Sequence, residues 1–141
     1  MRYSNWESRL ALHIDTIRNK PFCWGDHDCA LMAADCALAI TGTDFAAEFR
    51  GKYSTEQEAY DLIQQYAGGG LMALAEKIAT EFNLLEVKKS FAQRGDIVLA
   101  EDDGRNTLGV INLSGRGVLL PSVDGMVTRS LECVKRAWRI D

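Results

Sequence analysis

The sequence predicts a single α+β domain over residues 1–141, with helices in the first part of the chain and antiparallel strands after them. Apolar residues recur at helical spacing as far as Phe82. After Asn83 the pattern changes to short apolar runs separated by turns rich in Gly, Asp and Ser. The stretch from Ala30 to Ile40 is apolar almost all round, which is typical of a buried central helix. Helices followed by strands is the α+β pattern.

Spacing and caps delimit four helices. The first is expected over residues 6–18, with Asn5 as its cap. The second begins at Cys29 after the N-cap Asp28 and stops at Gly42. The third follows a capping box at 54–57, and the fourth covers 71–82, after a break at three consecutive glycines.

Six short strands are expected in the remainder of the chain. Clusters of turn residues at 101–104, 114–117 and 124–125 separate them. The expected strands are 84–87, 96–99, 108–113, 118–121, 126–128 and 132–140.

Composition excludes several classes of function. Of the 141 residues, 47% are hydrophobic and 26% charged, which is ordinary for a globular protein. The net charge of −4 and the lack of a dense basic cluster argue against a nucleic-acid partner. No apolar run approaches the roughly 20 residues of a membrane span. The first residues, Met1 to Ser4, lead into a charged segment, so no signal peptide is expected.

The most informative motif is Trp-Gly-Asp-His-Asp-Cys at residues 24–29. It places Cys29 in the first turn of a helix, where the helix dipole and unpaired N–H groups favour a thiolate. A cysteine so placed is the usual starting point for a cysteine hydrolase. His27 is the nearest candidate base, and Asp28 is either a catalytic acid or simply the N-cap. Trp24 is expected to pack under the helix start or to wall a substrate cleft.

Two further groups of residues have a structural and a functional interpretation. Phe45, Phe49 and Tyr53 put three aromatic side chains in one loop, which forms a docking surface if exposed and core if it packs on the second helix. The four cysteines are expected to be free thiols, and their spacing lacks the C-x2-C signature of zinc ribbons. A metal or iron–sulfur site built from them is an alternative; they are Cys23, Cys29, Cys36 and Cys133.

Three features in order suggest a family. A cysteine begins a helix after Trp-Gly-x-x-Asp, an Arg94-Gly95-Asp96 turn leads into an apolar strand, and a second strand starts near Leu108. This resembles the NlpC/P60 superfamily of circularly permuted papain-like cysteine peptidases, which act on cell-wall peptides. The chain is most similar to small phage and prophage proteins of that superfamily, which share W-G-x-x-D-C, F-R-G-x-Y (here 49–53) and A-W-R (here 137–139).

The resemblance implies a catalytic histidine at the start of the second strand, but that position is Thr107. Threonine cannot act as a general base near neutral pH, and the only histidines are His13 and His27. We therefore expect a structural protein of a phage or prophage tail tip or tail assembly, on a cysteine-hydrolase fold that has lost catalysis. Its partners would be other tail proteins, and it would occupy the host cytoplasm during assembly and then the virion tail. No cofactor is implied.

An active enzyme is the main alternative. It would be a cysteine peptidase or amidase that acts on peptidoglycan peptides through Cys29. Its base would be His27 or a histidine supplied by a partner chain.

Overall fold

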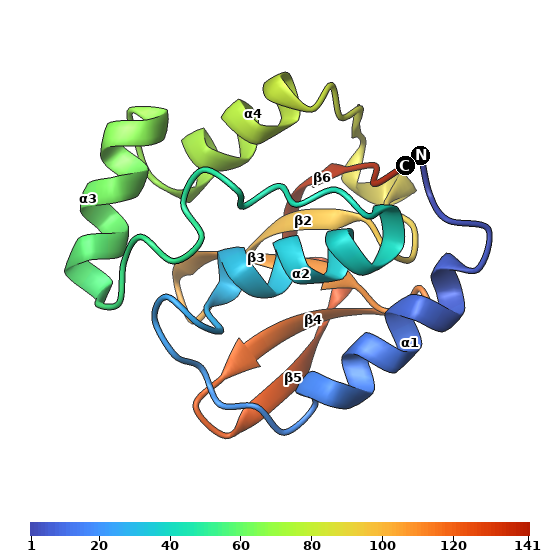
Figure 1. Cartoon of the computed structure of the whole chain (residues 1–141). Helices are drawn as coiled ribbons and strands as arrows, with labels where there is room; N and C mark the ends of the chain where they lie inside the picture. The colour runs from blue at the N-terminus through green and yellow to red at the C-terminus, as the bar shows by residue number, and fades with distance from the viewer.

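Four α-helices occupy the first part of the chain, and a six-stranded antiparallel sheet follows them (Figure 1). The computed structural model describes all residues from 1 to 141. The α+β prediction is confirmed, and so is the number of helices and strands. None of the helices has the length and apolar composition needed to cross a membrane.

The observed elements lie close to the expected ranges. The helices are α1 (Trp6–Ile17), α2 (Cys29–Thr41), α3 (Glu56–Ala67) and α4 (Leu71–Glu81). The strands are β1 (Glu86–Val87), β2 (Ile97–Asp102), β3 (Arg105–Ile111), β4 (Gly117–Ser122), β5 (Gly125–Ser130) and β6 (Val134–Trp138). Two 3₁₀ turns, η1 (Lys89–Phe91) and η2 (Leu131–Cys133), flank the sheet. Asn5 precedes α1 as expected, but its side chain makes no capping hydrogen bond.

The largest difference is the hairpin between β2 and β3. The expected four-residue turn at 101–104 is wrong, because Asp102 still pairs with Arg105 across the ladder. The turn contains only Asp103 and Gly104, both with positive φ (53° and 76°). An Asp-Gly pair of this kind forms the type I′ turn that matches the twist of the flanking strands. The hairpin is therefore longer than expected and extends toward the start of α2.

The predicted buried helix that starts at Cys29 is confirmed. Eight of the thirteen residues of α2 are buried, and they face both the sheet and the other helices. Asp28 caps its first turn, and Gly42 ends it in the left-handed conformation with φ 80°. In Figure 1, α2 crosses in front of β2 and β3, with α1 and α4 on either side of it.

The two faces of the sheet carry two separate apolar clusters. Alternate residues of a strand point to opposite faces, so Leu99 joins the cluster under the helices while Val98 and Ala100 join the other. All four helices contribute only to the first cluster. The second contains seven buried residues, all from the sheet strands, with Cys133 of η2 packed against it. Side chains on opposite faces of the sheet therefore cannot meet.

The sheet brings the two ends of the chain together. Its strand order is β1-β6-β2-β3-β4-β5, so the last strand inserts between the first two. Asp96, fully buried in the turn before β2, accepts the Gln93 N–H at 2.8 Å and the Arg139 Nε at 3.2 Å. The Arg2 guanidinium lies 3.6 Å from the same carboxylate, and Arg2 Nε donates to the Ile140 carbonyl at 2.5 Å. One buried carboxylate therefore joins both termini to the central hairpin.

The Asp96→Asn substitution tests this role. It leaves Arg2 and Arg139 without their counter-charge, so we expect the free energy of unfolding to fall by about 3 kcal/mol, the cost of breaking a buried pair. The measurement is urea unfolding of both proteins. The control Glu7→Gln removes the exposed pair with Arg94, and it should cost less than about 1 kcal/mol. Equal losses of stability in the two variants would show that the Asp96 pairs stabilise the fold no more than an exposed pair does.

Candidate functional site

A cleft with a volume of about 220 Å³ opens beside the first turn of α2. Cys29, at the start of the helix, lines the cleft. Thr107 of β3 lines it as well and lies next to Cys29. Most of the wall is apolar and comes from the loop before α2, from α3 and from the ends of α4 and β4; it includes Phe22, Trp24, Tyr60, Ile63, Leu71 and Pro121. The polar rim comes from the β2–β3 hairpin and consists of Asp102, Arg105 and Asn106.

Three polar groups lie close to the Cys29 sulfur, and one of them, the Thr107 hydroxyl, donates its hydrogen bond to the Leu108 carbonyl at 3.3 Å. The three groups are the Leu108 N–H, the Thr107 hydroxyl and the Ala30 N–H, and each lowers the pKa of the thiol. Burial acts in the opposite direction and is the largest influence, and the charge of Asp28 adds to it, so the pKa of Cys29 is raised overall. Burial of the thiol therefore opposes the thiolate expected at this helix start, although the side chain keeps some exposure to the cleft.

Asp28 lines the cleft and joins the segments around it through hydrogen bonds. Its Oδ1 accepts the Leu31 N–H at 2.9 Å, which caps α2, and its Oδ2 accepts the Gly25 N–H at 3.1 Å. The Tyr53 hydroxyl donates to the same Oδ2. This burial and hydrogen bond raise the pKa of Tyr53 well above its usual value, so the phenol stays protonated. The capping role is confirmed. Both oxygens of Asp28 therefore accept hydrogen bonds that join the loop before α2, the first turn of α2 and Tyr53.

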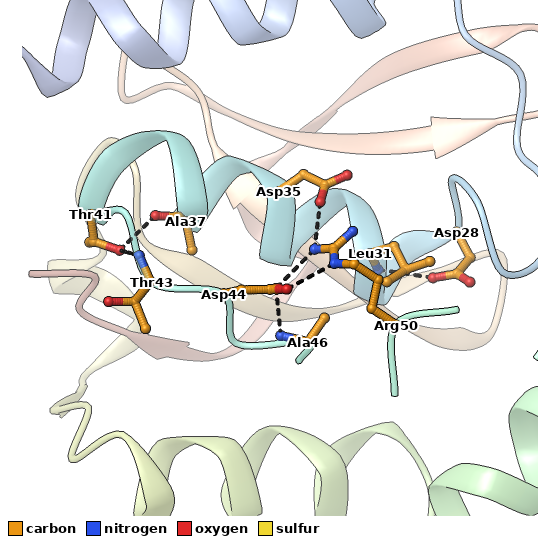
Figure 2. A network of polar contacts seen from close by, with 9 residues as sticks. All are labelled: Asp28, Leu31, Asp35, Ala37, Thr41, Thr43, Asp44, Ala46 and Arg50. Carbon is orange, nitrogen blue, oxygen red and sulfur yellow. Dashed lines mark hydrogen bonds and ion pairs between the residues drawn. The ribbon is translucent and has the colours of Figure 1, made fainter. Parts of the chain in front are cut away.

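The loop at residues 43–53 is fastened along α2 by Arg50 (Figure 2). Its Nε and one terminal nitrogen each lie 2.9 Å from the Asp44 carboxylate, in a bidentate pair. That terminal nitrogen also lies 2.7 Å from Asp35 of α2. The side-chain hydrogen bond from Arg50 lowers the pKa of Asp44, so the pair stays ionised. The loop is therefore fixed to α2 by Arg50 at its middle and by Tyr53 at its end.

The aromatic side chains of this loop do not form a docking surface. Phe45 and Phe49 are buried in the main core, where Phe45 packs on Phe82 with ring centroids 4.7 Å apart. Tyr53 is also buried, although it lines the cleft. Of the four residues expected to bind a partner, only Trp24 is not buried and also lines the cleft. It lies in the cleft wall, with its ring 6.0 Å from that of Tyr60.

His27 does not reach the cleft. Its side chain is fully buried and is absent from the cleft lining. Burial, followed by the charge of Lys20, lowers the pKa of His27. The backbone explains this placement, because His27 pairs with Cys23 in a tight turn that directs its side chain into the protein. As a base for Cys29, the His27 hypothesis lacks geometric support.

The proposed metal site is also wrong. No three His, Cys, Asp or Glu side chains lie close enough together to hold a metal ion. The sheet separates the cysteines, because Cys29 and Cys36 belong to the cluster under the helices and Cys133 packs on the opposite face. Cys23 is exposed. Burial raises the pKa of Cys36 to about 12, as expected for a small core residue.

Sequence reasoning missed the residues of the cleft rim. Asp102 pairs with Arg129 at 3.0 Å, and Asn106 accepts a hydrogen bond from Lys135 at 2.9 Å. Arg105 makes no ion pair. The sequence could have indicated these residues through Asp103-Gly104, a pair typical of two-residue hairpin turns. Such a turn extends both strands and brings their ends to the Cys29 cleft. No local pattern in the sequence predicts that Tyr60 lines the cleft, because its position depends on how α3 packs.

The chain belongs to the DUF6950 family, a domain of unknown function whose model matches residues 1–140. A search of curated proteins finds no match. The family description names no activity.

Gly25 tests the loop that supports the cleft. Its φ is +81°, and a Cβ there would overlap the Tyr53 carbonyl oxygen. Gly51 has φ +77° with no atom within 4 Å of such a Cβ, so it reports the backbone effect alone. We expect Gly51→Ala to lower the free energy of unfolding by about 1–2 kcal/mol and Gly25→Ala to lower it by more. Thermal or urea unfolding measures both, and equal losses would contradict the close contact.

Proposed function

We propose that the chain is a structural protein of a phage or prophage tail, built on a cysteine-hydrolase type of fold that has lost catalysis. The observation that carries the proposal is the pair formed by Cys29 and Thr107. A hydroxyl, and not an imidazole, faces the sulfur in the cleft. On this proposal the cleft is a binding surface for a peptide segment.

The arrangement of the cleft supports the resemblance to NlpC/P60 proteins. The resemblance implies that the second strand after the Gly-Asp turn begins next to the cysteine. Thr107 and Leu108 of β3 lie next to the sulfur, and each lowers the pKa of the thiol. The Gly95-Asp96 turn leads into β2, the strand that pairs with β3. The order and spacing of these features agree with a permuted papain-like scaffold.

The chemistry of the cleft supports the loss of catalysis. A cysteine nucleophile needs a base or a cationic partner to form its thiolate. Thr107 provides neither, His27 does not line the cleft, and burial raises the pKa of Cys29. General-base assistance typically contributes about 10²–10⁴-fold to the rate, so its absence leaves a poor hydrolase.

The tail setting rests on the resemblance to small phage and prophage proteins. The F-R-G-x-Y and A-W-R segments that suggested it are integral to this fold. Arg50 and Tyr53 fasten the 43–53 loop to α2, and Arg139 binds Asp96. The proposed partners are other tail proteins, with the host cytoplasm as the place of assembly and the virion tail as the final location.

An active cysteine peptidase remains the second candidate, and one observation favours it. Cys29 lines a cleft, and the Leu108 and Ala30 N–H groups lie near its sulfur and lower the pKa of the thiol. Such donors would also stabilise negative charge on a reacting group. On this alternative, a partner chain supplies the histidine, and peptidoglycan peptides are the substrate.

Alkylation of Cys29 tests whether the chain by itself forms a reactive thiolate. We expect its reaction with iodoacetamide to rise only above the ordinary thiol value of about 8.5, because burial keeps the thiol protonated. Mass spectrometry after alkylation at a series of pH values measures this, with exposed Cys23 as the internal reference. Rapid alkylation below about pH 7, together with turnover of murein peptides by the isolated chain, would overturn the proposal.

The Thr107→His substitution tests whether position 107 corresponds to the catalytic histidine that the resemblance implies. An imidazolium next to the sulfur stabilises the thiolate, so alkylation of Cys29 should extend to below about pH 7.5. Asn106→His is the matched control. It places the same side chain one residue away, where the native residue does not act on the sulfur. An unchanged profile in Thr107→His, or equal shifts in both variants, would contradict the proposed correspondence.

A further inference from the structure

A tight turn at residues 23–27 supports the wall of the cleft. The Cys23 N–H donates to the His27 carbonyl at 3.1 Å, and the His27 N–H donates back to the Cys23 carbonyl at 2.7 Å. The turn presents Trp24 to the cleft and leads directly into Asp28, the cap of α2. Movement of the turn would therefore change both the cleft wall and the start of the helix that bears Cys29.

The last residue of this turn, His27, has a buried imidazole. The side chain is 0% exposed, and neither ring nitrogen has a hydrogen-bond partner in the protein. A neutral imidazole leaves one donor and one acceptor unsatisfied there, while an imidazolium would leave two charged donors. The second state is much more costly to bury.

Lys20 lowers the pKa of His27, whereas the carboxylates raise it, and each of these groups already has another partner; the carboxylates are those of Asp35, Asp26 and Asp28. Lys20, which follows α1, has the same charge as an imidazolium and repels it, and its own partner is Asp26 at 3.4 Å. Asp35 of α2 is paired with Arg50 at 2.7 Å. Both carboxylate oxygens of Asp28 accept hydrogen bonds that hold the turn and the helix. None of these carboxylates accepts a hydrogen bond from either ring nitrogen of His27.

We propose that the 23–27 turn is a pH-sensitive latch, which closes the cleft wall while His27 is neutral and opens it when mild acid protonates His27. Opening lets the ring reach water, releases the Gly25 contact with Asp28 and moves Trp24 away from the cleft. The opening itself follows from the burial of His27. Its consequence for peptide binding rests on the proposed function of the cleft.

The direction of the pH effect follows from linkage. Burial lowers the pKa of His27 in the closed turn below the ordinary 6.5, whereas an open turn restores the ordinary value. The open state therefore binds the proton more tightly. The stability of the closed turn is complete above pH 6.5 and declines as the pH falls from there toward the lowered pKa.

Hydrogen exchange of the full chain tests the latch. Protection factors of peptides covering residues 22–31 are measured by mass spectrometry between about pH 5 and about pH 7.5. We expect protection in this segment to fall by up to about tenfold per pH unit, the slope of one proton. Peptides from the central sheet serve as the reference and should hold their protection. Constant protection of residues 22–31 across this range would overturn the proposal.

Two variants assign the effect to a residue. His27→Phe keeps an aromatic ring but cannot take a proton, so its protection should not depend on pH. His13→Gln removes the only other histidine and should leave the pH dependence in place. A pH dependence that survives His27→Phe, or that disappears in His13→Gln, would overturn the proposal.

Direct titration covers the case in which His27→Phe does not fold. The chain has two histidines, so the Hε1 resonances in a proton NMR titration are two, and His13→Gln identifies them. A His27 resonance that titrates at or above about 6.5 in the folded chain would overturn the latch. These readouts involve neither turnover nor alkylation, so the latch can fail while the proposed function stands, and the reverse.

Discussion

The burial of the Asp28 carboxylate is the constraint on which the rest of the cleft depends. A charge that is 1% exposed is tolerated only where donors satisfy it. Its donors come from three directions: from the first turn of α2, from the loop before it and from the Tyr53 hydroxyl at the end of the 43–53 loop. These three segments must therefore meet at one point. The position of Cys29, one residue later, follows from that meeting.

The sulfur of Cys29 is subject to two opposed effects, and their magnitudes decide the outcome. The end of a helix stabilises a nearby negative charge by about 0.3–1 kcal/mol, which is less than one pKa unit. Burial can raise the pKa of a group by up to about 3–5 units, and for the partly exposed Cys29 it is the largest influence on the thiol. Burial therefore dominates unless a cation lies next to the thiol, and Thr107 contributes only a hydroxyl. The residue at position 107 thus decides more about reactivity than the helix does.

Local patterns in the sequence predict most of the helices and strands, but they do not predict which of these elements lie next to one another in the fold. Periodicity and caps locate α2 within a residue, because Asp28 and Gly42 act on the chain around them. The insertion of β6 between β1 and β2 depends on contacts between distant residues, and no local pattern encodes it. The same limit explains the errors at the site. Whether Phe49 faces water or core, and whether His27 faces the thiol or the interior, is decided by packing.

The motifs that suggested a hydrolase are mostly requirements of the fold. Gly25 is needed because a side chain there would overlap the Tyr53 carbonyl, and Asp28 because α2 needs its cap. Arg50 fastens the 43–53 loop to α2. All of these contacts persist whichever residue stands at 107, because none of them involves it. A chain can therefore lose its catalytic base without losing these motifs, and their presence indicates how the cleft is built, while position 107 indicates whether it can react.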